Sequence, residues 1–285
     1  VYYTSFFVFF SNGLNEYLHF SFFYFFHYNY LQTPSPLQPS ILESSPIIHE
    51  MNQSFIKSVI SLKSLIFVAI QEVRDTEILD RTVSMLKNQF NLNYKYLASP
   101  KIGRKVKEIY AFLYRTDKVK YLDESYTVSD EKDLFIREPF FAKFKAGNFD
   151  FYVISIHIIW GDSIAERRAE ALLLDDVYLS VQNMDAENDI ILMGDFNLSP
   201  TDKGFVELLE ISDMIYVNEK IPTSIKDRLY DNIFFQSNYT KEFTGSFGVM
   251  KFDEQLFDND DKKASLMVSD HRPLWAEFGV SVDDG

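Results

Sequence analysis

Short apolar runs recur along the chain after residue 51, and turn-forming residues such as Gly, Pro, Asn and Asp lie between them. Runs of about four to eight apolar residues between turn signals are typical of β-strands. Several runs are apolar at nearly every position, which predicts strands that are covered on both faces. The pattern predicts strands at residues 65–70, 94–98, 109–114, 140–144, 151–157, 189–193, 232–235 and 274–278.

Two segments have the spacing of amphipathic helices. Residues 163–181 open with Ser163 and Glu166, a pair that fits a capping box. The same segment carries apolar residues four positions apart, at Ala169, Leu173, Val177 and Val181. A second helix is predicted over residues 78–90. Strands that alternate with helices in this way predict an α/β fold, with sheets packed on each other and helices outside.

The first fifty residues differ in composition from the rest of the chain. Fifteen of the first thirty residues are Phe or Tyr, and four Pro follow between residues 34 and 46. The uncharged run at residues 17–31 is shorter than the roughly 20 residues of a spanning helix. Three interpretations stay open: a membrane-associating leader, a poorly ordered tail, or sequence outside the functional protein. The third is favoured because the first Met of the chain is Met51. We therefore predict residues 1–50 as a separate leader and residues 51–285 as one domain.

Composition narrows the chemistry. The chain has 285 residues, 46% hydrophobic and 25% charged, which suits a globular α/β domain. It has no Cys, so disulfides, Cys-ligated zinc, iron–sulfur clusters and thiol nucleophiles are excluded, and a reducing cytoplasm is the favoured compartment. The net charge of -14 argues against a nucleic-acid partner. This argument is weak, because a metal site adds acidic residues to the chain and its bound cations reverse the negative electrostatic field around them.

Acidic and amide side chains follow the predicted strands. Glu72 comes after the first run, Asp195 and Asn197 after the run at residues 189–193, and Asp270 before the last. Alone, each fits a surface carboxylate or an Asx turn. If residues 195–197 are extended, Asp195 and Asn197 face one pocket while Phe196 packs away from it. Together they predict a Mg²⁺ site, since Mg²⁺ takes one or two carboxylates and keeps most of its waters.

Two histidines complete the candidate chemistry. Of five His, only His157 and His271 lie well beyond the leader, and each is at a strand end or polar turn. A lone His in such a place is more often structural, and Asp231 alone fits a turn. Imidazoles oriented by carboxylates also supply proton transfer near neutral pH and positive charge for a phosphoryl group. The set therefore predicts metal-assisted hydrolysis of a phosphodiester.

Taken in order, eight segments carry a family resemblance. They are residues 71–75, 107–115, 137–140, His157, and residues 175–179, 193–197, 230–231 and 269–271. In this order they resemble the endonuclease/exonuclease/phosphatase superfamily, and most closely its deoxyribonuclease I branch. The resemblance implies a four-layer α/β sandwich, with two β-sheets inside and helices outside. It also implies a Mg²⁺-dependent endonuclease, with Mn²⁺ as an alternative ion, that hydrolyses double-stranded DNA by in-line attack of water and leaves 5′-phosphate ends.

The resemblance also implies roles for single residues. Glu72 and Asp270 correspond to metal ligands, and Asp195 and Asn197 to the rest of the metal and phosphate site. Glu108 corresponds to the acid that pairs with His157, and Asp231 to the partner of His271. For DNA, Arg74 corresponds to a residue that enters the minor groove and Arg137 to a phosphate contact. No protein partner is implied.

The chain departs from the family pattern at its start. The family opens with a strand that ends in an Asn of the metal site, and Asn12 is only a faint match. Asp133, Phe135 and Glu138 resemble a structural Ca²⁺ loop by spacing, although such an acidic loop is more often simply solvated. Two other functions stay open. One is the same chemistry on a phospholipid, phosphoinositide or RNA; the other is a non-catalytic DNA- or protein-binding descendant that lacks the first strand.

Overall fold

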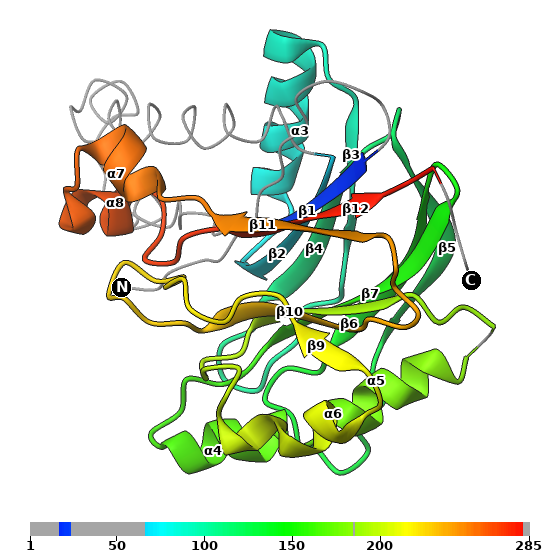
Figure 1. Cartoon of the computed structure of the whole chain (residues 1–285). Helices are drawn as coiled ribbons and strands as arrows, with labels where there is room; N and C mark the ends of the chain where they lie inside the picture. The colour runs from blue at the N-terminus through cyan, green and yellow to red at the C-terminus, as the bar shows by residue number, and fades with distance from the viewer. Residues whose placement is uncertain (1–16, 24–65, 185, 282–285) are drawn as a thin grey trace.

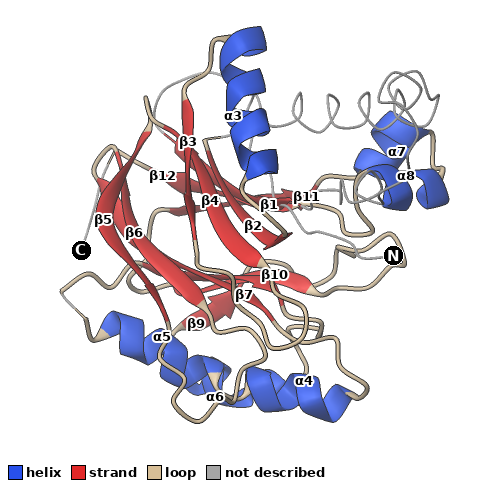
Figure 2. Ribbon diagram, turned by 180° about the vertical axis from the view of Figure 1, so that it is seen from behind, coloured by secondary structure: helices blue, strands red, loops and turns tan. Residues whose placement is uncertain are grey.

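The computed structural model of the chain describes residues 17–23, 66–184 and 186–281. Two β-sheets pack face to face in the middle of the molecule, and helices lie on the outer side of each sheet (Figures 1 and 2). The layers are helix, sheet, sheet and helix. This is the four-layer α/β sandwich that the sequence resemblance implied, and the expectation is confirmed.

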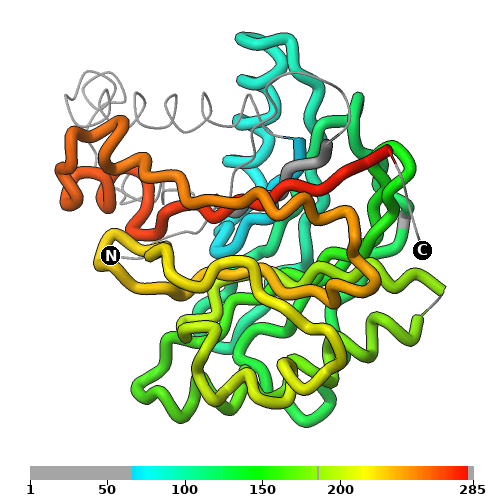
Figure 3. The backbone as a smooth tube through the Cα atoms, in the orientation of Figure 1, coloured from blue at the N-terminus to red at the C-terminus, as the bar shows by residue number. Residues whose placement is uncertain are grey.

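The first sheet has six strands in the order β11-β12-β1-β2-β4-β3. In that order their bounds are Phe243–Val249, Leu274–Gly279, Tyr17–Phe23, Phe67–Val73, Ile109–Arg115 and Tyr94–Ala98. Only β1 and β2 run parallel to each other. Figure 3 shows β12, in red, beside β11, in orange.

The second sheet also has six strands, in the order β5-β6-β7-β8-β10-β9. Their bounds are Val119–Thr127, Phe140–Ala146, Phe149–His157, Ile190–Asp195, Asp231–Gln236 and Met214–Tyr216. Here β7 and β8 are parallel and the other pairs are antiparallel. All residues of β8 and β10 are buried, as expected for strands whose sequences are apolar nearly throughout.

Helices cover the outer faces. On the first sheet lies α3 (Glu77–Phe90), whose Leu79, Thr82 and Leu86 are buried. On the second sheet lie α4, α5, the 3-10 helix η2 and α6, with bounds Ile164–Ala171, Leu174–Gln182, Lys203–Phe205 and Val206–Glu210. The short helices α7 (Phe252–Phe257) and α8 (Asp261–Met267) connect β11 to β12. No helix among the described residues is both long and apolar enough to span a membrane.

Phenylalanine rings join the two sheets. Phe67 of β2 meets Phe144 of β6 edge to face, with ring centroids 4.9 Å apart. Phe112 of β4 stacks on Phe140 of β6 at 5.5 Å. Such pairs add about 0.5–1.5 kcal/mol each beyond the burial of their surface. A second apolar cluster packs between the second sheet and its helices, so the central strands of this sheet are buried on both faces.

All eight predicted strands are present, within a few residues of the predicted bounds, and so is the helix predicted at residues 78–90. The single helix predicted over residues 163–181 is wrong, because the chain forms α4 and α5 with a break at Leu172 and Leu173. The two helices have different partners. Arg168 of α4 pairs with Asp202, which caps η2, whereas α5 packs on β8 and α6. Ser163 does cap α4, as predicted.

The strand β1 lies inside the segment that the sequence analysis set apart as a leader. In the structure β1 pairs with β12 on one side and β2 on the other, so it is a member of the first sheet. The backbone groups of β12 and β2 that face β1 are therefore paired. The domain boundary at residue 50 stays a prediction, because residues 24–65 and Asn12 lie outside the described residues.

Candidate active site

Three strand ends of the second sheet bring His157, Asp195 and Asp231 into one row. His157 is the last residue of β7 and pairs in register with Asp195, the last residue of β8. Asp195 in turn pairs with Asp231, the first residue of β10. The strands β7 and β8 end, and β10 begins, at the same end of the sheet. Polar side chains from three distant parts of the sequence therefore lie on neighbouring strands there.

Gly194 allows this row to form. A Cβ atom at Gly194 would lie 1.9 Å from the carbonyl oxygen of Ile156 on the neighbouring strand β7. No side chain fits at that distance, so only glycine permits the close approach of β7 and β8 just before Asp195. The Gly-Asp sequence at the end of this strand is therefore explained by packing as well as by chemistry.

The first sheet supplies the facing side chains. Glu72 lies in β2 at a register shift against β4, with a left-handed φ of 55°. A bulge of this kind redirects a side chain, and non-glycine residues in the left-handed region are concentrated at functional sites. Glu108 directly precedes β4, and His271 lies three residues before β12. Gln71 of β2 donates from Nε2 to Ser155 Oγ of β7 at 2.7 Å, a buried hydrogen bond that ties the two sheets together beside the site.

Glu108, His157 and Arg137 form the first buried group. Nδ1 of His157 lies 2.9 Å from Oε1 of Glu108, and Nε of Arg137 lies 3.0 Å from Oε2 of the same carboxylate. Burial acts to raise the pKa of Glu108, but His157 and Arg137 outweigh it and lower that pKa to about 2. Burial and Arg137 oppose protonation of His157, while Glu108 and Glu72 outweigh them and raise its pKa. Glu108 is therefore a fixed anion that orients the imidazole.

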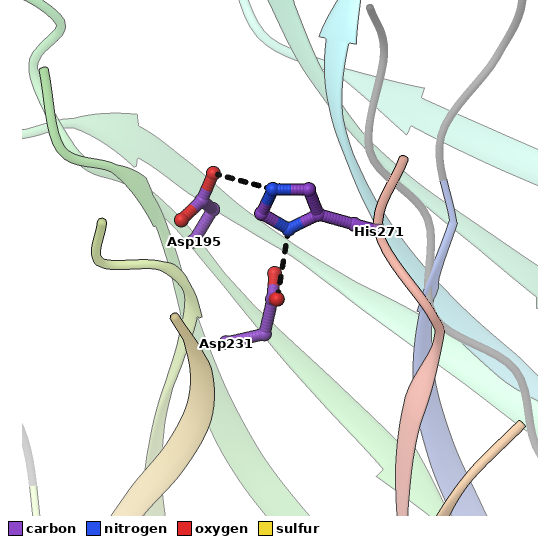
Figure 4. Close-up of side chains that lie close together, drawn as sticks. All are labelled: Asp195, Asp231 and His271. Carbon is purple, nitrogen blue, oxygen red and sulfur yellow. Dashed lines mark hydrogen bonds and ion pairs between the residues drawn. The ribbon is translucent and has the colours of Figure 1, made fainter. Parts of the chain in front are cut away.

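Asp231 and His271 form the second buried pair. Nδ1 of His271 lies 2.8 Å from Oδ2 of Asp231, and both carboxylates in Figure 4 point towards the His271 ring. Burial opposes the charged form of His271, but Asp231 and then Asp195 outweigh it and raise the pKa of this imidazole to about 10. The ring is held in place by the backbone as well, since His271 N donates to Ser269 Oγ at 2.9 Å.

Asp195 connects the two pairs. Its Oδ2 lies 3.7 Å from Nε2 of His157 and 4.0 Å from Nε2 of His271. Glu72 joins them, with Oε1 3.7 Å from Nε2 of His157. The two imidazoles, which are 114 positions apart in the chain, thus face one shared carboxylate. Groups able to give and to accept protons meet in one buried site.

The donor set fits a divalent cation. Ligand atoms of Asp195, Asp231 and His271 all lie within 4.8 Å of one another. Burial raises the pKa of Glu72 to about 8, and the nearby Glu108 carboxylate adds to the rise. A cation bound beside Glu72 would favour its charged form and offset that cost. Asp270 is not part of the three-residue cluster; its carbonyl accepts from Ile225 N at 2.8 Å. Its assignment as a metal ligand stays a prediction.

Asn197 lies beside Asp195 for a different reason than predicted. The segment is not extended, because Asn197 has a left-handed φ of 50° and its N–H donates to Asp195 Oδ1 at 2.8 Å, as in an Asx turn. Its side chain donates from Nδ2 to the carbonyl of Ile158 at 2.8 Å. Phe196 between them is fully buried. The turn therefore holds the Asp195 carboxylate and links β8 to the segment after β7.

The two predicted DNA contacts are both partly buried and each contacts other residues of this chain. Arg74 is partly buried and donates from Nη1 to the carbonyl of Lys107 at 3.3 Å. The side chain of Arg137 is only 13% exposed and is committed to Glu108. The positive charge of Arg137 thus lies within the site, and a variant at this position would disturb the Glu108–His157 pair as well as any substrate contact.

Arg104 contacts the loop that resembles a calcium site. Arg104 forms an ion pair with Asp133 Oδ1 at 3.1 Å and donates to the carbonyls of Asp133 and Phe135. These oxygens are the type that Ca²⁺ would bind, and here a guanidinium supplies the positive charge. The structural Ca²⁺ site at Asp133, Phe135 and Glu138 stays a prediction.

Sequence reasoning missed several residues that position the site. The fully buried hydroxyl of Tyr110 accepts from His157 N at 2.9 Å. The buried carboxylate of Glu170 on α4 accepts from Ile136 N at 2.6 Å and from Ile159 N at 2.8 Å, next to Arg137 and His157. Tyr110 lies within an apolar run and Glu170 lies on a helix. The signal in the sequence that could have identified them is a polar group at a position predicted to be buried, because such a group needs a hydrogen-bond partner.

Comparisons with known proteins agree on one family. The Endonuclease/Exonuclease/phosphatase family model matches residues 52–271. A deoxyribonuclease of Thioalkalivibrio sp. is 33% identical over 226 residues, which cover 74% of this chain but 62%, less than two thirds, of that protein. Deoxyribonuclease-1 of Gallus gallus is 31% identical over 226 residues, which cover 72% of this chain and 78% of that protein. An endonuclease/exonuclease/phosphatase family structure from Bacteroides thetaiotaomicron superposes with a TM-score of 0.53 at 17% identity, over 82% of this chain and 91% of that one.

Proposed function

This chain belongs to the endonuclease/exonuclease/phosphatase family, and we propose that it is a divalent-metal-dependent endonuclease that hydrolyses double-stranded DNA and leaves 5′-phosphate ends. The observation that carries the proposal is the meeting of two histidine–carboxylate pairs at Asp195. Phosphodiester hydrolysis needs a proton removed from water and a proton delivered to the leaving oxygen, and two imidazoles in one site provide both.

Residues of this chain supply the orientation and the proton transfers of the reaction. Glu108 and Asp231 fix the orientation of His157 and His271 through Nδ1, which leaves both Nε2 atoms facing Asp195. Water forms the new bond to phosphorus while the bond to the 3′ oxygen breaks; one imidazole takes the proton of water and the other gives a proton to the leaving oxygen. The Arg137 guanidinium adds positive charge near the phosphoryl group.

Asp195 and Glu72, which both lie 3.7 Å from Nε2 of His157, would hold the cation, with Asp231 and His271 close to Asp195. When bound, Mg²⁺ or Mn²⁺ neutralises the non-bridging oxygens of the phosphodiester and orients the attacking water. This donor set is rich in oxygen, which suits Mg²⁺ or Mn²⁺ better than a soft metal.

A basic loop beside the site supports a polyanionic substrate. Residues 101–107 contain four cationic side chains and no acid in a chain whose net charge is -14. Those four side chains are exposed, namely Lys101, Arg104, Lys105 and Lys107. The loop leads directly into Glu108 of the first pair, and Arg74 is bonded to its last carbonyl. Contacts with phosphates from such a loop strengthen binding in a salt-dependent way.

Supercoiled plasmid is the substrate that tests the proposal. The full chain should nick it with Mg²⁺, EDTA should abolish nicking, and His271→Ala should reduce it about 10²-fold or more while the circular dichroism spectrum is unchanged. Nicking that persists in EDTA, or in a folded His271→Ala variant, would exclude this mechanism. A wild-type protein that binds DNA without cutting it would support the non-catalytic alternative.

The choice between DNA and another phosphoester needs variants outside the catalytic groups. Lys105→Ala/Lys107→Ala should raise the KM for DNA and reduce the salt dependence of binding by up to about two phosphate contacts. Hydrolysis of bis(p-nitrophenyl) phosphate, a small diester, should be unchanged. Lys220→Ala/Lys262→Ala removes the same charge at other exposed positions and is the matched control. Equal losses on both substrates would argue against DNA as the substrate.

A further inference from the structure

An exposed tryptophan lies next to the catalytic groups. Trp160 follows His157 by three residues and is 54% exposed, among the largest exposed apolar side chains of the described residues. Its ring meets that of Tyr230 at 72° with centroids 5.7 Å apart. The Tyr230 ring lies 6.2 Å from the His271 ring. A row of three rings thus leads from the surface to the second histidine–carboxylate pair.

This tryptophan is held rigidly. The guanidinium carbon of Arg167 lies 3.8 Å from the centre of the Trp160 ring. The same guanidinium donates from Nε to the Trp160 carbonyl at 2.5 Å and from Nη1 to the Asn197 carbonyl at 3.3 Å. The next residue, Gly161, has a φ of 58°, and a Cβ there would lie 2.3 Å from Glu166 Oε2. The turn and the arginine therefore fix the ring relative to the Asp195–Asn197 turn.

The exposed surface of the ring suits a flat partner. Arg167 covers one face of the Trp160 ring, and Tyr230 approaches that ring at an angle. The exposed surface of Trp160 is therefore mainly its other face and its rim. An exposed aromatic ring that is already immobilised loses little conformational entropy when it stacks on a ligand. The cation behind the ring and the basic loop suit a ligand that carries phosphates.

We propose that Trp160, with Arg167 behind it and Tyr230 at its edge, forms a platform on which one unpaired base of the substrate stacks beside the scissile phosphate. Stacking needs a free base face, and within a duplex both faces of every base are covered by neighbouring pairs. The platform therefore favours single-stranded DNA, strand ends, or a base that has left the duplex. This inference rests on the proposed DNA hydrolysis and adds a preference for unpaired nucleotides to it.

The chain offers its own spectroscopic test, because Trp160 and Trp275 are its only tryptophans. Trp275 belongs to β12 in the other sheet, and its ring lies over Gly248. In a His157→Ala background, so that the DNA survives the titration, the Trp275→Phe protein reports on Trp160 alone. Oligothymidylate should quench its fluorescence, whereas the Trp160→Phe protein, which retains Trp275, should show no quenching. An abasic oligonucleotide of equal length, which carries the phosphates without bases, should bind without quenching. Equal quenching by both oligonucleotides would overturn the platform.

Cleavage kinetics give an independent readout. Trp160→Ala should raise the KM for a single-stranded oligonucleotide about tenfold, at the lower end of what loss of one base–aromatic stack costs. The kcat for that substrate and the nicking of plasmid should change less than about twofold, and Trp160→Phe should restore most of the KM. Equal losses on single strands and plasmid would instead assign Trp160 a structural role through Arg167. If the wild-type protein cuts no DNA, the proposed function fails, and the fluorescence comparison still decides whether the platform exists.

Discussion

Replacement of Asp231 by Asn tests whether the second histidine–carboxylate pair works as the geometry indicates. The substitution keeps the size of the side chain and removes its charge. Asp231 accepts the Nδ1–H of His271 at 2.8 Å, and both side chains are buried. With Asn, the ring loses its anionic acceptor, and the amide can turn its NH₂ towards Nδ1 and favour the other tautomer.

The size of the effect follows from the interaction that is lost. A hydrogen bond to a charged group contributes about 1.5–3 kcal/mol, which corresponds to a roughly 10- to 150-fold loss of rate if the reaction depends on this orientation. The pKa of His271 is raised to about 10 although burial opposes it, and Asp231 is the largest cause of the rise. In the Asn variant the pKa should fall towards its usual range, so the imidazole loses its proton at a lower pH.

Plasmid nicking rates and the titration of His271 followed by NMR would measure these two effects. Asp227→Asn is the matched control, because it removes the same charge from an exposed carboxylate 3.5 Å from the neighbouring Arg272. Its rate should stay within about twofold of the wild type. If Asp231→Asn folds normally and cuts DNA as fast as this control, Asp231 does not orient a catalytic imidazole and our reasoning is wrong.

Two further predictions concern stability. Asp253 is fully buried and binds Arg272 through contacts of 2.6–3.1 Å, so Asp253→Ala should lower the free energy of unfolding by about 3–5 kcal/mol in urea titrations. Recovery of most of that loss in Asp253→Leu/Arg272→Met is expected, and a loss below about 1 kcal/mol in the single variant would contradict the assignment. Burial raises the pKa of Glu187 from 4.5 to about 7, so the folded state holds this proton more tightly and stability should fall as pH rises through that window. Relative to Glu187→Gln, the wild type should lose stability between pH 4.5 and 7, and parallel pH curves for the two proteins would refute this.

Most interior strands of the two sheets, β1 excepted, could be predicted from the sequence because they depend on local pattern. Most predicted strands are apolar runs, and a run covered on both faces can be recognised without knowledge of its neighbours. Four described strands were not predicted: β5, β9 and β11 are sheet edges, and β1 lies inside the first sheet. The polar and glycine positions of the three edge strands fit a half-solvated edge, where alternation is weak and the apolar run disappears.

Some features of the candidate site could also be predicted from the sequence, and others could not. The residue types and their order along the chain are enough to identify Glu72, His157, Asp195 and His271 as candidates. The sequence did not reveal that Glu72 lies on a bulge, that Asn197 forms an Asx turn, or that Arg137 is bound to Glu108. The bulge and the Arg137–Glu108 contact depend on segments that are distant along the chain, whereas the Asx turn is a local choice that the sequence also allowed to be extended.

The sequence by itself determined which strands are buried, which acids and imidazoles end them, and which family the chain resembles, because those properties belong to short stretches of residues. Only the tertiary structure decided that β1 completes the first sheet, that Arg104 pairs with Asp133 of the loop that resembles a calcium site, and that Tyr230 lies between Trp160 and His271. The physical reason is register. Strand pairing and sheet packing set which distant side chains meet, and one residue of slippage would turn His157 or Asp195 to the opposite face.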